Sequence, residues 1–570
     1  MSEEKTDLLD VQIDGVWHQF PKGTRMIEAC RQVDVEVPHY CYHPKLTSPG
    51  NCRMCLVEMG MPPRPRPGDD PPEPDESGHL PISWMPRPAI ACANTIAPGM
   101  GIRTTGELTE ECRKGVMELL LANHPLDCPI CDQAGECGLQ EFSVEHGKGN
   151  SRFREQKVKK PKNVQVGPRI RLDDERCIMC SRCIRFTDEI ADDPVLGFTD
   201  RGSHTTLSVY PGRELANNYS LNTADICPVG ALTSNDFRFQ MRVWFMRETQ
   251  TIDTNCGTGC NIVVHERQGK IYRITPRQNN DVNSDWMPDS HRLNYHWIDS
   301  DARLTEPLVR DGDNHRAADW SEAMASASEK LSKLDGAEIA VIASARMTNE
   351  ELLMVNRLVK HLGAGHVDTV PRKQEGDGYL ISDDGNPNTN GVKLVLGLDD
   401  PGSQLDAIKK GIEEGRIKGL IALQENLVDD ADFNAETLGK LDFFLTSYPL
   451  ANPTADAADF VLPGACWAEK SGTMINVTGR LQRLNKAVDG PGLTLEPWEI
   501  VRDLIQATGG GNGIYSATEI FAQLAAEVSE FTDLTWDQIG DLGIPLIETG
   551  VTIPLLEREK ERIAKGLVVG

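Results

Sequence analysis

A group of cysteines at a cluster-binding spacing lies in the N-terminal half of the chain. Cys177, Cys180 and Cys183 are separated by two residues each, and the distant Cys227 is followed by Pro228. Three thiols on one tight loop can bind three corners of an iron–sulfur cube, and a remote Cys-Pro supplies the fourth ligand. A two-cluster ferredoxin would place a second set of thiols at four positions that hold no cysteine here: Thr187, Asn217, Ser220 and Thr223. This Cys177 set therefore predicts one [4Fe–4S] cluster whose neighbouring site has been lost.

Two further sets of metal-ligating residues precede it. The Cys41 set comprises Cys41, Cys52, Cys55 and Cys92, and the His124 set comprises His124, Cys128, Cys131 and Cys137. The Cys-x2-Cys pair of the Cys41 set is typical of both [2Fe–2S] loops and structural zinc sites, and the hairpin pattern before it favours the cluster. The spacing of the His124 set leaves zinc and an iron–sulfur cluster both open, because imidazole and thiolate bind either metal.

Composition limits the class of protein. Fifteen of the sixteen cysteines precede residue 261, and only Cys466 follows it. The first ten residues are polar and lack the apolar core of a secretion signal, so we expect a cytoplasmic protein whose thiols bind metal or pack in the core. The net charge of −27 argues against nucleic-acid binding. No apolar run is long enough to predict a membrane span.

Local patterns outline the elements that must position the N-terminal ligands. Residues 8–40 predict a hairpin and a short helix. Residues 61–88 hold ten prolines and predict a solvated loop, and residues 148–171 hold nine Lys or Arg and predict a solvated connector. Residues 105–123 predict a helix capped by Thr104 or Thr105, with an apolar face made of Leu108, Cys112, Val116, Leu119 and Leu120.

The second half of the chain has a different pattern. Short strands recur between residues 250 and 300. Beyond residue 305, buried runs at 339–342, 393–396 and 419–423 alternate with helical segments such as 349–362. This alternation predicts an α/β domain with a mostly parallel sheet.

The order of the ligand sets resembles that of one known family. The hairpin, the Cys41 set, the stretch HPLDCPICDQAGECGLQ from His124 to Gln140 and the Cys177 set follow one another as in the large iron–sulfur subunit of respiratory complex I, NADH:quinone oxidoreductase. The resemblance implies a [2Fe–2S] cluster at the Cys41 set, one [4Fe–4S] cluster at each of the other two sets, and His124 as a ligand. It also implies an electron-transfer subunit without an NADH or quinone site. Its partners would be a flavin- and NADH-binding subunit and the iron–sulfur subunits of the quinone module.

The same resemblance implies a multidomain architecture of α+β and α/β parts. The chain would lie on the cytoplasmic side of the inner membrane and associate with it only through the peripheral arm of the complex. The expected domains are a [2Fe–2S] ferredoxin-like β-grasp domain at 8–104 with the Pro-rich insertion at 61–88, a small helical [4Fe–4S] domain at 105–146, a ferredoxin-like [4Fe–4S] domain at 147–248, a small domain at 249–305 and a degenerate molybdopterin-oxidoreductase-like α/β domain at 306–570.

Two regions resemble sites that have lost their cofactor. Residues 249–305 resemble the small iron–sulfur domain of molybdopterin oxidoreductases, but Gly259 and Val263 stand where the second and third ligands would be. We therefore expect no cluster there, and expect Cys256 and Cys260 to be buried and inert. The stretch 454–480 resembles the molybdopterin domain itself. Cys466 lies inside that motif, away from the family's metal-ligand position, so we expect a small buried residue and no molybdopterin.

Other functions remain open from the residues alone. An NAD-linked hydrogenase subunit would share the N-terminal ligand sets, and a molybdenum- or tungsten-dependent formate dehydrogenase would share the C-terminal resemblance. A scaffold with structural zinc is the third alternative. No G-x-G-x-x-G motif follows a strand and opens a helix, so no dinucleotide site is expected.

Overall fold

The computed structural model describes residues 7–64, 72–511 and 513–569. The described chain divides into two compact units. The first extends to Trp244 and also includes the C-terminal segment from Glu559, and the second is Phe245–Arg558.

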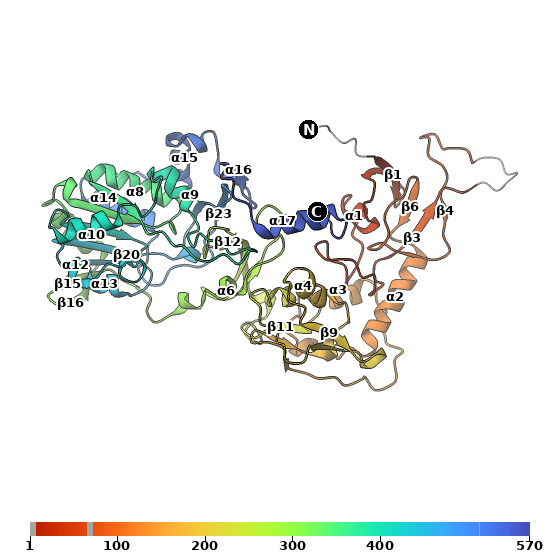
Figure 1. Ribbon diagram of the computed structural model, residues 1–570. Coiled ribbons are helices and arrows are strands. Elements are labelled where there is room, and N and C mark those ends of the chain that lie inside the picture. The colour runs from red at the N-terminus through yellow and green to blue at the C-terminus, as the bar shows by residue number, and fades with distance from the viewer. Residues whose placement is uncertain (1–6, 65–71, 512, 570) are drawn as a thin grey trace. The chain divides into compact units, whose positions relative to one another are not determined.

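The first unit begins with a mixed sheet (Figure 1). Strands β1 (Leu8–Ile13) and β2 (Val16–Pro21) form the expected hairpin. Strand β6 (Met100–Arg103) runs parallel to β1 and antiparallel to β3 (Leu56–Met61). Helix α1 (Met26–Arg31) buries Met26, Ile27 and Ala29 in the core that these strands share. A helix packed on a mixed sheet is the arrangement expected for a β-grasp domain.

Most of the described part of the Pro-rich insertion is the exposed loop that its composition predicts, but two of its residues form a strand. Residues 65–71 lie outside the described residues. Strand β4 (Ser83–Trp84) pairs with β3, and β5 (Ala89–Ile90) follows directly and also pairs with β3. Ile82 packs so closely on the sheet that a Cβ at Gly60 or Gly101 would overlap it. The few apolar residues between the prolines thus anchor the insertion on the sheet. The average composition of the segment does not predict this contact.

Helix α2 (Glu107–Ala122) confirms the predicted element but buries a different face. Its N-cap is Gly106, because the hydroxyl of Thr104 instead donates to the carboxylate of Asp14. The buried positions are Thr109, Arg113 and Met117, whereas Leu119 on the predicted apolar face is 79% exposed. The predicted cap and apolar face are therefore wrong. The hydrogen bond to the distant Asp14 keeps Thr104 from capping the helix. The residues of the predicted apolar face are half-buried or exposed in this unit.

Short elements make up the rest of the first unit. The basic connector is not freely solvated as predicted, because Lys157 Nζ donates to the last carbonyls of α2, those of Leu121 and Ala122, at 2.9 and 2.8 Å. A lysine at a helix C-terminus satisfies orphan carbonyls and complements the helix dipole. The elements are α3 (Gly138–Glu145), β7 (Val164–Gln165), β8 (Ile170–Leu172), α4 (Arg182–Glu189), β9 (Leu196–Thr199), β10 (Thr206–Val209), α5 (Asn222–Asp225) and β11 (Leu232–Ser234).

The described part of the second unit contains two three-stranded sheets and a seven-stranded sheet. One small sheet confirms the short strands predicted between residues 250 and 300, as β12 (Arg247–Ile252), β13 (Asn261–Arg267) and β14 (Lys270–Pro276). The other consists of β22 (Gly472–Ile475), β23 (Arg480–Leu484) and β24 (Ile544–Pro545). The larger sheet has the order β16-β15-β21-β20-β19-β17-β18, and its strands from β21 to β18 are parallel. Its strands are β15 (Leu308–Asp311), β16 (Asn314–Ala317), β17 (Ile339–Ala343), β18 (His366–Thr369), β19 (Gly419–Leu423), β20 (Phe443–Tyr448) and β21 (Phe460–Pro463).

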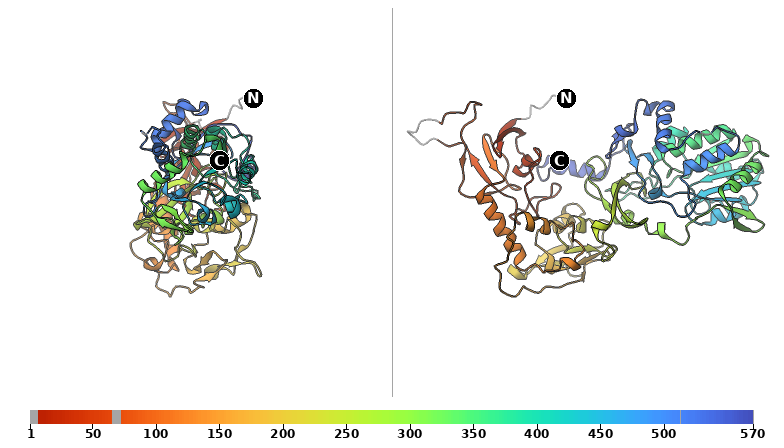
Figure 2. Two further views of the ribbon diagram at one scale, coloured as in Figure 1. Left: turned by 90° about the vertical axis from the view of Figure 1, so that its left-hand side faces the viewer. Right: turned by 180° about the vertical axis from the view of Figure 1, so that it is seen from behind.

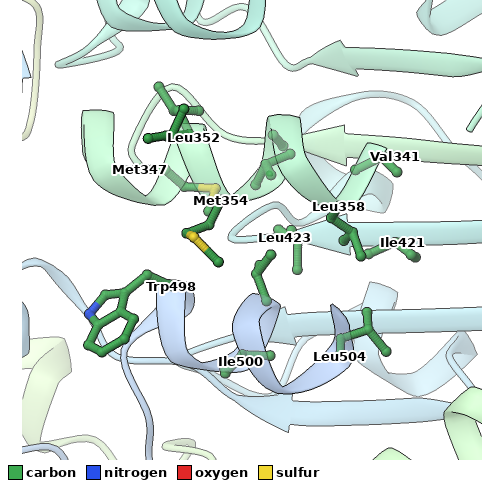
Figure 3. Packing of buried hydrophobic residues seen from close by; sticks show 14 of the residues in the cluster. Val341, Met347, Leu352, Met354, Leu358, Ile421, Leu423, Trp498, Ile500 and Leu504 are labelled. Carbon is green, nitrogen blue, oxygen red and sulfur yellow. The ribbon is translucent and has the colours of Figure 1, made fainter. Parts of the chain in front are cut away.

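Helices pack on both faces of this parallel sheet, which Figure 2 draws from two further directions. Val341 and Ile421 face α8 (Asn349–Leu362) and α14 (Pro497–Ala507), and Figure 3 shows Leu358 and Leu504 packed against them. Ala340, Ile342 and Leu420 face the opposite side, towards α10 (Leu405–Glu413). Burial of both faces explains why these strands are continuous apolar runs in the sequence.

One predicted strand is wrong. Residues 393–396 belong to a π-helical turn, Val392–Leu396, that ends at Gly397 in a left-handed backbone conformation. A short apolar run cannot be distinguished from a buried helical segment by periodicity alone. The flanking glycines at 391 and 397 were the available signal against a strand.

Candidate iron–sulfur sites

The structure brings all four thiols of the Cys41 set together. The side chain of Cys52 is hydrogen-bonded to that of Cys41, and the side chain of Cys92 is hydrogen-bonded to those of Cys41 and Cys55. All four are buried. Cys92 therefore joins its set despite the long insertion before it. The hydrogen bond to Cys41 and burial together raise the pKa of Cys52 well above its usual range, so binding of a metal centre here would release protons.

The loop that carries Cys52 and Cys55 is bent by left-handed backbone conformations. Gly50 has a φ of 60° and Arg53 a φ of 62°. The bend lets the backbone N–H of Met54 donate to the thiol of Cys52. Backbone donors aimed at sulfur are one of the means by which proteins tune an iron–sulfur centre.

The Cys177 set lies on a loop of the same kind. Met179 and Ser181 both have left-handed backbone conformations, and α4 begins directly after them. Backbone N–H groups donate to Cys227 from three residues that follow it: Val229, Ala231 and Leu232. Cys177, Cys180 and Cys227 all interact electrostatically with Cys183, so the four thiols of this set are neighbours. Burial is the main reason that the pKa of Cys183 lies well above its usual range.

The positions of the predicted lost site are filled by locally bonded polar residues. Thr223 Oγ1 donates to the carbonyl of Ser220 at 2.7 Å, and Thr187 Oγ1 donates to the carbonyl of Ile184 at 2.9 Å. Asn217 Nδ2 donates to Asp193 at 2.9 Å. Thr187, Ser220 and Thr223 are fully buried. Hydroxyls that bond their own backbone occupy this space without providing soft ligands for iron.

The His124 set lines a cavity of about 70 Å³. His124 lies on the loop after α2, Cys128 begins the short 3-10 helix Cys128–Ile130, and Cys137 immediately precedes α3. A Cβ at Gly230 would overlap Cys131 Sγ, so the cavity depends on a residue without a side chain at this position. Burial lowers the pKa of His124 to about 4, which keeps the imidazole neutral, as a ligand must be. The donors and the space fit a cluster held by one imidazole and three thiolates.

The Cys177 and His124 sets adjoin one another. The backbone N–H of Gly138 donates to the carbonyl of Pro228 at 3.1 Å, which joins the residues directly after Cys137 and Cys227. Cys137 and Cys227 also interact electrostatically. Among the described residues, no three His, Cys, Asp or Glu side chains surround the position of a single metal ion.

Family models match successive segments of the chain between residues 6 and 507. A 2Fe-2S iron-sulfur cluster binding domain matches residues 6–107, and the NADH-ubiquinone oxidoreductase-G iron-sulfur binding region matches residues 113–152. The ferredoxin-like domain of NADH-quinone oxidoreductase subunit 3 matches 167–233, and the NDSU1/NuoG-like 4Fe-4S domain matches 246–296. The molybdopterin oxidoreductase model matches 303–390 and 388–507.

Curated relatives match over most of the chain. The mitochondrial NADH-ubiquinone oxidoreductase 78 kDa subunit of Neurospora crassa is 30% identical over 88% of this chain and 81% of its own. The chain belongs to this family, that of the large iron–sulfur subunit of NADH:quinone oxidoreductase. The mitochondrial 78 kDa subunit of Candida albicans is 29% identical over 88% of this chain and 83% of its own. A chain of a solved NAD+-reducing [NiFe]-hydrogenase covers 41% of this chain at 25% identity and a TM-score of 0.34.

Two thiols, those of Cys256 and Cys260, lie in the region that resembles a small iron–sulfur domain. Cys256 and Cys260 are both fully buried and form no disulfide. Burial raises the pKa of Cys256 to about 11. The second and third ligand positions of the resembled site are occupied by Gly259, which has a left-handed backbone conformation, and by Val263, which lies in β13. Neither residue has a donor side chain. These findings agree with buried and unreactive thiols.

Cys466, the only cysteine after residue 260, lines a different cavity. Cys466 contributes to the wall of a cavity of about 350 Å³ together with Arg346, Gln424, Trp467 and Lys470. Its side chain accepts a hydrogen bond from the backbone N–H of Glu469, and burial raises its pKa well above the usual range. Cys466 is therefore a buried thiol, as expected.

Proposed function

We propose that this chain relays electrons within NADH:quinone oxidoreductase through three iron–sulfur centres. The Cys41 set would hold a [2Fe–2S] cluster, and the Cys177 and His124 sets would hold one [4Fe–4S] cluster each. Bound at these sites, the clusters supply one-electron carriers. The observation that carries the proposal is that the Cys177 set lies beside each of the other two sets.

The contacts between the sets support a defined order. Residues next to Cys227 bond to residues next to Cys137. On the other side of the Cys177 set, Arg185 of α4 donates to the carbonyl of Cys41. Electrons would therefore pass between the Cys41 and His124 sets by way of the Cys177 set. The family resemblance implies the direction, from the Cys41 set to the His124 set.

The types of ligand would set part of the difference in reduction potential between the His124 and Cys177 centres. His124 is neutral, whereas a fourth thiolate would add a negative charge beside the cluster. Replacing thiolate by imidazole raises the potential of a cluster, as it does in Rieske centres. The His124 centre would thus favour accepting an electron from the Cys177 centre, other effects on the two being equal.

The partners follow from the role of a relay. A flavin-bearing subunit would oxidise NADH and deliver electrons one at a time, and iron–sulfur subunits of the quinone module would receive them. No helix among the described residues is long and apolar enough to cross a bilayer. The chain would sit in the peripheral arm, on the cytoplasmic side of the inner membrane, and the second unit would offer a surface to neighbouring subunits without binding molybdopterin.

Metal analysis and electron paramagnetic resonance of the full chain test this proposal. We expect about ten iron atoms per chain and three reducible signals, one of them from a [2Fe–2S] cluster. About fourteen iron atoms with a fourth signal would contradict the loss of the cluster at Cys256 and Cys260. Stoichiometric molybdenum or tungsten would favour a formate dehydrogenase, and zinc without reducible signals would refute electron transfer.

A further inference from the structure

Arg182, the first residue of α4, links two of the ligand sets. Its Nη1 donates to the carbonyl of Ile226, the residue before Cys227, at 3.2 Å. Its Nη2 donates to the carbonyl of Tyr42, the residue after Cys41. A planar guanidinium with several N–H donors can hold two carbonyls in a fixed relation, which a lysine cannot do in the same way. One side chain therefore joins the backbone of the Cys41 set to that of the Cys177 set.

The charge of Arg182 reaches the thiols of both sets. It interacts electrostatically with Cys41 and Cys52 on one side and with Cys180 and Cys227 on the other. Its two hydrogen bonds to described residues go to carbonyl groups and not to a carboxylate, so no ion pair neutralises it there. The local field at both sets thus contains the positive charge of Arg182, beside that of Arg185, which interacts with Cys41 and Cys180 but also with the carboxylate of Glu189.

One donor of this guanidinium is buried without an acceptor. Arg182 Nε has no hydrogen-bond partner among the described residues. A buried donor that stays unsatisfied costs about 1–3 kcal/mol, and more when it carries charge. The thiolates and sulfides of a bound cluster are the acceptors that this environment otherwise lacks.

Other contacts keep the two loops together without Arg182. Arg185 Nη1 and Nη2 donate to the carbonyls of Thr47 and Cys41. Glu189, at the end of α4, accepts a hydrogen bond from the backbone N–H of Thr47 at 2.9 Å. Asn51 Nδ2 donates to the carbonyl of Met179 at 3.3 Å. Loss of the Arg182 charge therefore leaves several links between the Cys41 loop and α4 in place.

We propose that Arg182 is a positioning residue shared by the Cys41 and Cys177 centres, and that its charge stabilises the reduced state of both. This inference rests on the proposed function. Reduction of a cluster adds one negative charge to it, and a fixed cation near two clusters favours the reduction of each. A single residue then raises both reduction potentials together and changes the difference between them little.

The test is a potentiometric titration, followed by electron paramagnetic resonance, of the full chain with its clusters assembled. In Arg182→Gln the equilibrium constant for reduction should fall about tenfold at both centres, which is 59 mV for a one-electron couple. The reduction potential of the His124 centre should shift less, so this centre serves as an internal reference. Arg182→Lys keeps the charge and should recover most of both shifts. Arg213→Gln is the matched control, because the Arg213 side chain is exposed and forms an ion pair with Asp193.

The outcomes separate this inference from the proposed function. Unchanged potentials in Arg182→Gln, a shift at only one of the two centres, or an equal shift in Arg213→Gln would each overturn it. If Arg182→Gln does not assemble its clusters, Arg182→Lys decides: wild-type potentials support the role of the charge, and a tenfold fall at both centres contradicts it. A wild-type chain without reducible clusters would instead refute the proposed function.

Discussion

The cavity of the His124 set depends on a missing side chain, which makes Gly230→Ala a sharp test. Gly230 has no left-handed φ, so its backbone can accept alanine without conformational strain. The added Cβ would nevertheless overlap Cys131 Sγ, one of the four proposed ligands. Either the thiol or the backbone after Cys227 must move. Both movements change the space in which the cluster would lie.

The magnitude follows from overpacking at a site with little room. The cavity measures only about 70 Å³, and Cys131 is 8% exposed, so its thiol has few alternative positions. Forcing one methyl group into a packed interior costs about 1–3 kcal/mol. For a unit of this size that corresponds to a fall in Tm of roughly 2–12 °C. The iron content should fall from about ten to about six atoms per chain if the cluster is lost.

Iron analysis, electron paramagnetic resonance and thermal unfolding measure these effects on the same sample. Gly138→Ala is the matched control, because Gly138 directly follows Cys137 and its Cβ would meet only Pro228 and Tyr40 at ordinary contact distances of 3.6 and 3.8 Å. We expect this control to keep all three signals. A Gly230→Ala chain with full iron content and an unchanged signal from the His124 centre would refute the assignment of the cavity to a cluster.

Three further predictions concern individual side chains. His124→Ala should perturb or remove one [4Fe–4S] signal and leave the [2Fe–2S] signal intact, and an unchanged spectrum would exclude His124 as a ligand. Cys92→Ser should remove the [2Fe–2S] signal, whereas Cys30→Ser, at a buried core thiol outside the set, should preserve it; equal spectra would remove Cys92 from the set. Although burial opposes it, the charge of Asp253 at 2.7 Å raises the pKa of His291, so their pair stabilises the fold below about pH 6.5 and loses that contribution as the pH rises through the raised pKa. Urea unfolding of wild type and His291→Gln should differ more at about pH 6 than at about pH 8, and a constant difference would argue against the pair.

The elements of the fold were predictable where the residue pattern was long and regular. The hairpin at residues 8–21, helix α8 and strand β19 follow from alternation, capping residues and apolar runs. The failures involve short or mixed segments. The π-helical turn at 392–396 looked like a strand, and Thr104 made a hydrogen bond to a distant residue instead of capping α2. Local propensity is a weak guide when a tertiary contact competes for the same group.

The sequence by itself determined the chemistry of the ligand sets. Thiols and one imidazole at these spacings specify iron–sulfur or zinc binding whatever the fold, because ligand type and loop length are properties of the chain. Only the tertiary structure decided that Cys92 reaches its set across the insertion, that Gly230 leaves space beside Cys131, and that Arg182 lies between two sets. These relations join residues far apart in the chain. They depend on packing and on backbone carbonyls, which leave no pattern in the order of the amino acids.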